Sequence, residues 1–155
     1  MPWLDFNDTI NGAEARAYAM VDGQNLPMFY LKNLKTTAKT NKKDGKTLGN
    51  RATQHKKTGW SGEGTATIYY ATSFFRQMML KYIKTGVDTY FDIVVTNDDP
   101  GSKIGAQTII LKRCNLNEVS MALVDVENEA LEEDISFTFE GVDMPEAFSE
   151  PTLLG

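Results

Sequence analysis

The sequence has few of the residues that build metal sites and disulfides. Its 155 residues include one cysteine, Cys114, and one histidine, His55. A single cysteine cannot form an intramolecular disulfide, and the usual zinc site needs several Cys or His ligands. We therefore expect no metal, no other cofactor and no disulfide framework. We interpret Cys114 as a buried structural thiol.

Long hydrophobic runs are also missing. No stretch approaches the roughly 18 apolar residues of a membrane helix. The N-terminus, MPWLDFNDTING, lacks the basic and apolar regions of a secretion signal. We therefore expect synthesis in a cytoplasm and no membrane partner. The length suits a single domain, residues 1–155.

No pattern supports catalysis. Gly45-Lys46-Thr47 resembles the end of a phosphate-binding loop, but Thr40 stands where that motif needs a glycine. The acidic residues run along one end of the chain, whereas glycosidase chemistry needs two carboxylates facing each other across a cleft. An enzyme would need a convergent polar site, and the sequence offers none. We predict that the protein is not an enzyme.

Charge is distributed unevenly along the chain, although the net charge is only −5. Nine of the 16 Lys and Arg residues lie between Lys32 and Lys57, opposed there only by Asp44. No basic residue follows Arg113, and eleven acids do. The chain thus has one basic segment and one acidic end.

Alternation of apolar and polar residues dominates the rest of the chain. A period of two places every second side chain on one face of a strand. Such patterns predict strands at 15–21, 65–70, 91–96 and 135–140, and apolar composition adds 28–35, 107–114 and 119–126. Asp22-Gly23 is typical of a hairpin turn, 97–102 of a longer loop, and Asn115–Glu118 of a tight connection.

One helix interrupts the strands, at residues 73–86. Its apolar positions, Phe75, Met78, Met79, Tyr82 and Ile83, follow the i, i+3, i+4, i+7, i+8 spacing of an amphipathic stripe, which we interpret as core packing. Ser73 is expected to cap the start of the helix and Gly86 to end it. The predicted fold is therefore mainly β: an antiparallel sandwich or barrel with one flanking α-helix and a long extended arm.

The arm is residues 36–64, nearly all polar, basic or glycine. Structureless loops of this length are uncommon in compact domains and are usually functional or disordered. We expect the arm to become ordered against a neighbouring subunit. Complementary patches on one chain give head-to-tail contacts that close into rings or propagate as filaments.

A family resemblance is carried by short pieces along most of the chain. These are Thr9-Ile10-Asn11-Gly12 with Glu14, Val21-Asp22-Gly23, Thr58-Gly59, Gly62-Glu63-Gly64-Thr65-Ala66-Thr67, Glu129-Ala130-Leu131-Glu132-Glu133, and Phe137-Thr138-Phe139-Glu140 with Pro145-Glu146. Together they resemble the tail tube (core-tail) proteins of PBSX-like prophages and related contractile particles.

The resemblance implies a structural subunit that forms hexameric rings stacked into a tube inside a contractile sheath. Its partners would be other copies of itself, the sheath protein, and baseplate, initiator and terminator proteins. The particle would be a phage tail or a tail-like bacteriocin, assembled in the bacterial host cytoplasm, with DNA only as passing cargo.

Specific residues are expected to carry the contact between rings. On the arm we choose Lys42, Lys43, Lys46, Arg51, Lys56 and Trp60. The acidic partner surface is expected to include Glu129, Glu132, Glu133 and Asp134. The alternative is a nucleic-acid-binding module that acts through the basic arm, because clustered cations beside an aromatic residue also suit phosphate and bases.

Overall fold

Eight antiparallel strands form the fold, seen here in a computed structural model that describes residues 3–21, 23–27, 31–151 and 153. In chain order the elements are η1 (Phe6–Asp8), β1 (Ala15–Val21), β2 (Gln24–Pro27), β3 (Leu31–Gly45), β4 (Gln54–Tyr69), α1 (Phe74–Thr85), β5 (Phe91–Asp98), β6 (Ala106–Glu118), β7 (Glu132–Phe139) and β8 (Gly141–Glu146). The strands follow the path β2-β1-β5-β6-β7-β4-β3, and β8 pairs with β6. The predicted fold class is confirmed.

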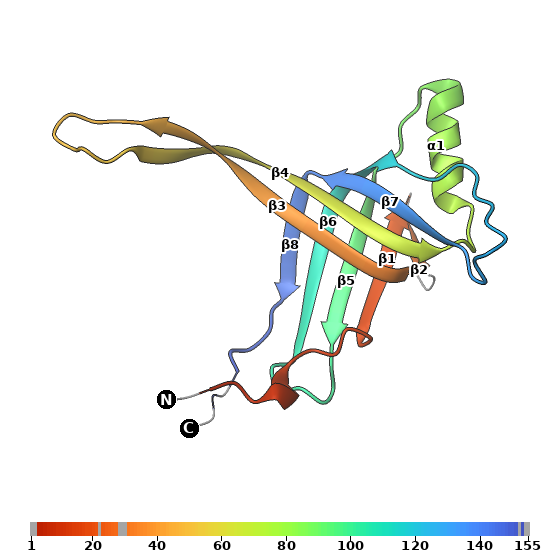
Figure 1. Ribbon diagram of the computed structural model, residues 1–155, viewed down its shortest axis with the longest axis horizontal. Helices are drawn as coiled ribbons and strands as arrows, with labels where there is room; N and C mark the ends of the chain where they lie inside the picture. Colours follow the sequence, from red (N-terminus) through yellow and green to blue (C-terminus); the bar gives the residue numbers. More distant parts are fainter. Residues whose placement is uncertain (1–2, 22, 28–30, 152, 154–155) are drawn as a thin grey trace.

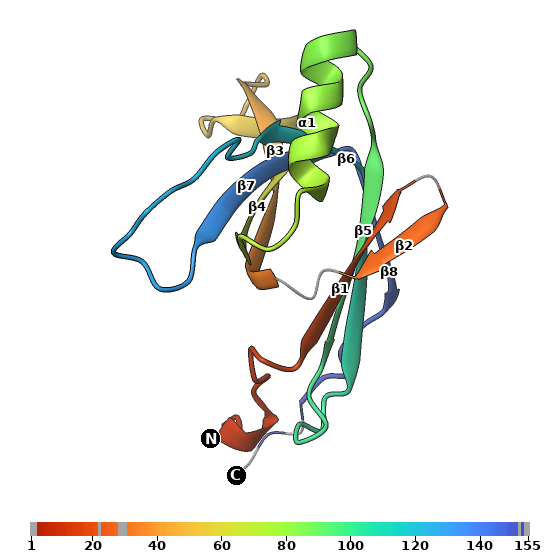
Figure 2. The same ribbon diagram turned by 90° about the vertical axis from the view of Figure 1, so that its right-hand side faces the viewer.

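Strand β6 belongs to two layers. Its first part pairs with β5 and β8, while its last part pairs with β7. A bulge separates the two parts: Arg113 has a positive φ of 52°, and its N–H donates to Asp92 Oδ1 at 3.1 Å. Bulges bend strands, and here the bend turns β6 from one layer into the other (Figures 1 and 2).

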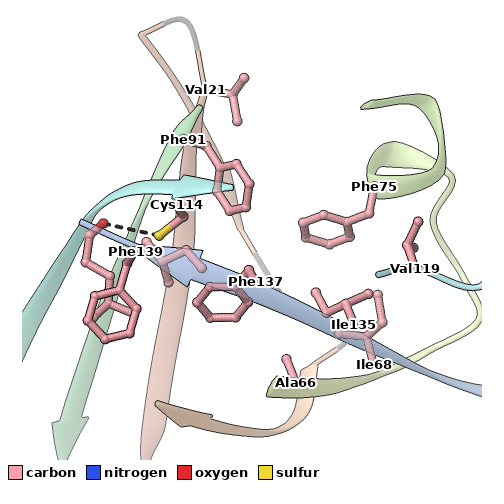
Figure 3. Packing of buried hydrophobic residues seen from close by; sticks show 12 residues of the cluster. Val21, Ala66, Ile68, Phe75, Phe91, Cys114, Val119, Ile135, Phe137 and Phe139 are labelled. Atoms are coloured by element: carbon pink, nitrogen blue, oxygen red, sulfur yellow. Dashed lines mark hydrogen bonds between the residues drawn. The ribbon is translucent and has the colours of Figure 1, made fainter. Parts of the chain in front are cut away.

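The core lies between the two layers and under one end of α1 (Figure 3). The alternating inward residues of β7, of the second half of β4, and of parts of β1 and β5 form this core. Phe137, Ile68, Ile93, Leu111, Ile135 and Cys114 are its largest fully buried side chains.

The helix forms almost where the periodicity predicts it, with one difference at its start. Gly86 ends it in the left-handed conformation, φ 72°, and donates its N–H to the Tyr82 carbonyl. The predicted Ser73 side-chain cap is wrong: Ser73 makes no such bond, and Thr72 Oγ1 accepts from the Phe74 N–H at 3.3 Å. The apolar stripe is buried only in part. Phe75 is buried, whereas Tyr82 and Ile83 are exposed.

Two predictions between β6 and β7 are wrong. Asn115–Glu118 is no tight connection, because β6 continues through it and pairs with β7. Residues 119–126 do not form a strand, and none of the described strands pairs with them. The predicted hairpin after β1 is confirmed by its pairing with β2, although Asp22 lies outside the described residues. For the predicted strand 28–35, the described part begins at Leu31.

The predicted arm, 36–64, has regular structure within a single chain. Strands β3 and β4 pair from Leu31↔Ile68 to Gly45↔Gln54 as one long hairpin, which projects from the body in Figure 1. The expectation that these residues become ordered only against a neighbour is therefore wrong. Each strand of the hairpin supplies hydrogen-bond partners for backbone groups of the other, so the extended part has regular pairing within the single chain.

Candidate assembly interfaces

The outer half of the hairpin extends beyond the core and touches it only at its root. Along β4, Gly62, Gly64, Ala66 and Ile68 are buried, whereas all residues from Gln54 to Ser61 are exposed. We call residues 39–61 the outer arm. A two-stranded ribbon standing alone in water is marginally stable, so the outer arm is a segment expected to gain stability from a partner.

The root of the outer arm is held by aromatic packing. Trp60 lies opposite Thr40, and its ring centroid is 6.1 Å from that of Phe139 in the core. Trp60 is 46% exposed. It therefore joins the arm to the body while still offering part of its ring to a neighbouring molecule.

The outer arm concentrates positive charge that has no counterion in this chain. Among the described residues, Lys32 pairs with Glu132 at 2.7 Å, but the other basic residues of the hairpin form no ion pair. These eight are Lys35, Lys39, Lys42, Lys43, Lys46, Arg51, Lys56 and Lys57, all exposed. The predicted arm set thus includes five cations on one projecting element.

Strand register brings like charges face to face. Lys42 lies opposite Lys57, and Lys43 lies opposite Lys56. Like charges directly across an antiparallel pair are destabilising. An acidic partner would relieve this repulsion. The outer arm is therefore a surface suited to binding negatively charged groups. Near its tip, His55 Nδ1 lies 2.5 Å from Asp44 Oδ1, at hydrogen-bonding distance.

The predicted acidic partner surface is divided by the fold. Glu129 is exposed, Glu132 is paired with Lys32, and Asp134 accepts a hydrogen bond from Thr67 Oγ1 at 2.7 Å. Glu133 is buried, only 2% exposed, and pairs with Arg76 of α1. Alternation along β7 causes this, because Glu133 shares the inward face with Ile135 and Phe137. Glu133 is therefore removed from the predicted surface, and the other three residues remain predictions.

Sequence reasoning missed the role of Arg76. Its guanidinium donates to Glu133 and to the Thr72 carbonyl, and it lies 4.2 Å over the Tyr70 ring. Burial raises the pKa of Glu133, and the nearby Arg76 opposes that rise. The contact holds the start of α1 against the sheet. In the sequence, Arg76 is one basic residue on the polar side of the predicted helix, and no local pattern indicates that it pairs with Glu133.

Cys114 is buried, as predicted. Its Sγ lies 3.6 Å from the Leu111 carbonyl, and burial raises its pKa to about 12. The thiolate is the reactive form of cysteine, so burial and the raised pKa both disfavour reaction of this thiol in the folded chain. Within the described ranges, no group of three or more His, Cys, Asp or Glu residues is arranged to hold a metal ion, and no helix is long and apolar enough to cross a membrane.

A second exposed region lies between β6 and β7. Val124 and Val126 are 88% and 95% exposed, and the acids beside them are exposed as well. In Figure 1 this connection and the outer arm lie at opposite ends of the long axis of the molecule. A chain with a basic projection at one end and an acidic segment at the other suits head-to-tail association.

Comparisons with known proteins agree with this geometry. A family model described as "Phage tail tube protein" matches residues 3–146. The phage-like element PBSX protein XkdM of Bacillus subtilis (strain 168) is 39% identical over 147 residues, which cover 95% of this chain and 97% of that protein.

Two solved structures share the fold at low sequence identity. A chain in the sheath–tube complex of an extracellular contractile injection system, PVC, in its extended state has a TM-score of 0.62 at 12% identity, covering 90% of this chain and 93% of that chain. The SPP1 tail tube has a TM-score of 0.63 at 9% identity, covering 93% of this chain and 81% of that chain.

Proposed function

Because this chain belongs to the phage tail tube protein family, we propose that it is a structural subunit of the inner tube of a contractile phage or tail-like particle. The subunits assemble into hexameric rings, and the rings stack into the tube. Sheath, baseplate, initiator and terminator proteins are the further partners, and assembly takes place in the bacterial host cytoplasm. DNA is cargo where the particle carries any.

The outer arm is the observation that supports a stacking role. It is a preformed ribbon that projects beyond the core, carries seven Lys and Arg residues without an ion pair to any described residue of this chain, and sets Lys42 and Lys43 opposite other lysines. These features are costly for a monomer, because like charges repel across strands. They are useful when an acidic surface of another copy, including Glu129, Glu132 and Asp134, supplies the opposite charge.

The test is assembly of the purified protein, followed by negative-stain electron microscopy and light scattering. Wild-type protein is expected to form six-fold rings and hollow tubes. The double variant Lys43→Gln/Lys56→Gln is expected to stay folded and to form markedly fewer tubes, because the arm loses charge needed by its partner.

A matched control keeps the net charge change the same. Lys81→Gln/Lys84→Gln also removes two exposed cations, from α1 instead of the arm, and is expected to assemble like wild type. Normal tubes from the arm variant would contradict the arm's role. Failure of wild type to form rings or tubes, even on an isolated baseplate, would contradict the tube assignment.

Nucleic-acid binding remains a second candidate, because unpaired cations beside Trp60 also suit a phosphate backbone. DNA retention by the purified protein over a salt series distinguishes the two. Tight retention at physiological salt that is lost in Lys43→Gln/Lys56→Gln, together with no assembly, would favour the second candidate. Assembly without retention would exclude it.

A further inference from the structure

The connection between β6 and β7 has the side-chain pattern of a strand without being one. In Val124-Asp125-Val126-Glu127, apolar and acidic residues alternate, so an extended chain here would have one apolar face and one acidic face. Both valines are almost fully exposed. A β-branched pair exposed in this way has no packing role in the single chain.

Much of the backbone of this connection also makes no hydrogen bonds within the described chain. From Met121 to Val124, no backbone group makes a hydrogen bond to another described residue. The connection is fixed at both ends, by the buried Val119 and by the Leu131 carbonyl, which accepts from the Tyr70 N–H at 2.8 Å. Free backbone groups in an extended segment are those that pair with a sheet edge.

The described sheet offers three edges to such a segment: β2, β8 and the outer side of β3. Strand β2 is four residues long and ends in Pro27. Strand β8 contains Pro145 and carries Asp143 and Glu146, which would repel an acidic partner. Strand β3 is 15 residues long, contains no proline and is basic. The edge of β3 is therefore the best complement.

We propose that residues 121–127 of one copy add as a strand to the free edge of β3 in a second copy. This inference rests on the proposed tube function and names the segments that meet. Each face of the added strand would meet complementary side chains of β3. The valines would lie beside Thr36, Ala38 and Thr40, and the acids would lie beside Lys35 and Lys39.

Placement in the fold agrees with contact between copies. The edge of β3 continues into the outer arm at one end of the molecule, and the β6–β7 connection lies at the other end (Figure 1). Pairing would open the turn in which Asp125 Oδ1 accepts from the Glu127 N–H and the Asp125 carbonyl accepts from the Asn128 N–H. Backbone bonds along the added strand replace these two.

Hydrogen exchange tests strand formation directly. In the monomer, the amides of residues 121–124 are expected to exchange rapidly. In assembled tubes, alternate amides of residues 121–127 are expected to slow by at least about tenfold. Tubes made from mixed ¹⁴N and ¹⁵N protein and treated with a zero-length carbodiimide should yield intermolecular links from Lys35 or Lys39 to Asp125 or Glu127.

A pair of matched variants tests the apolar face. Val124→Asp/Val126→Asp is expected to leave the monomer's thermal melt unchanged, since both side chains are exposed, and to raise the protein concentration needed for assembly at least about tenfold. Val124→Thr/Val126→Thr keeps the branched shape and is expected to assemble like wild type.

The outcomes separate the two proposals. Wild-type tubes in which residues 121–127 exchange at the monomer rate, or in which Lys35 and Lys39 link only to other acids, would overturn this inference and leave the tube function standing. Normal assembly of the Asp variant would do the same. A wild-type protein that forms neither rings nor tubes would overturn both.

Discussion

At the scale of single residues, two glycines of β4 make room for aromatic rings of β7. Gly62 and Gly64 lie opposite Phe139 and Phe137 on β7, and the two aromatic rings cover the space where side chains would stand. A Cβ on Gly64 would lie 2.6 Å from Phe137 Cζ and 2.9 Å from Thr36 Cγ2. Phe137 is 1% exposed and cannot move aside. The absence of a side chain is therefore a packing requirement here.

We expect Gly64→Ala to lower the free energy of unfolding by about 1–3 kcal/mol, the usual cost of overpacking a well-filled core. Urea denaturation monitored by tryptophan fluorescence and circular dichroism gives the value. Gly59→Ala is the control, because a Cβ there meets nothing within 4 Å, and it should change stability by less than about 0.5 kcal/mol. Equal effects of the two substitutions would show that the rings do not require the glycine.

At the scale of elements, α1 is attached to the sheet by a buried charge as well as by Phe75. Arg76 reaches Glu133 on β7, and both side chains are largely withdrawn from water. Breaking a buried pair on one side leaves an unpaired charge, which is far costlier than replacing both partners by apolar groups. The pair therefore determines how the helix is placed more than how stable the fold is.

Arg76→Met is expected to destabilise the protein by about 3–5 kcal/mol, and Arg76→Met/Glu133→Leu to recover most of that loss. Lys112→Met removes an exposed pair with Asp143 and should cost no more than about 1 kcal/mol. The free energies come from denaturant melts of all three variants. A double variant as unstable as Arg76→Met alone would show that the ion pair itself is a net stabilising contact.

At the scale of the whole molecule, charge and shape are both asymmetric. The outer arm carries unpaired cations at one end of the long axis, and the β6–β7 connection carries exposed acids at the other. Such a molecule is complementary to a second copy in a head-to-tail arrangement, which is the arrangement that the proposed function needs. The proposed tube function rests on contacts between copies and requires no convergent polar site.

Assembly should consequently weaken as salt is added. Exposed charges are screened beyond a Debye length of about 10 Å at 0.1 M salt and about 3 Å at 1 M. We expect the concentration needed for tube formation, measured by light scattering, to rise steadily between these two conditions, while the thermal melt of the monomer changes little. Salt-independent assembly would mean that apolar contacts alone hold the rings together.

Local patterns in the sequence determined much of this protein. Alternation predicted β1, β5 and β7, and the 3.6-residue period with Gly86 predicted α1, because these signals need only neighbouring residues. The family resemblance and the two-sided distribution of charge were also readable without a fold, and the family is confirmed.

Other features depended on contacts between distant segments. β6 continues to Glu118 because β7 lies beside it, and Glu133 on the inward face of β7 finds its partner Arg76 on α1. Residues 119–126 have the pattern of a strand, but no strand in the described part of the chain pairs with them. A side-chain period indicates which face a residue would take, whereas only the tertiary structure decides whether a partner strand is present.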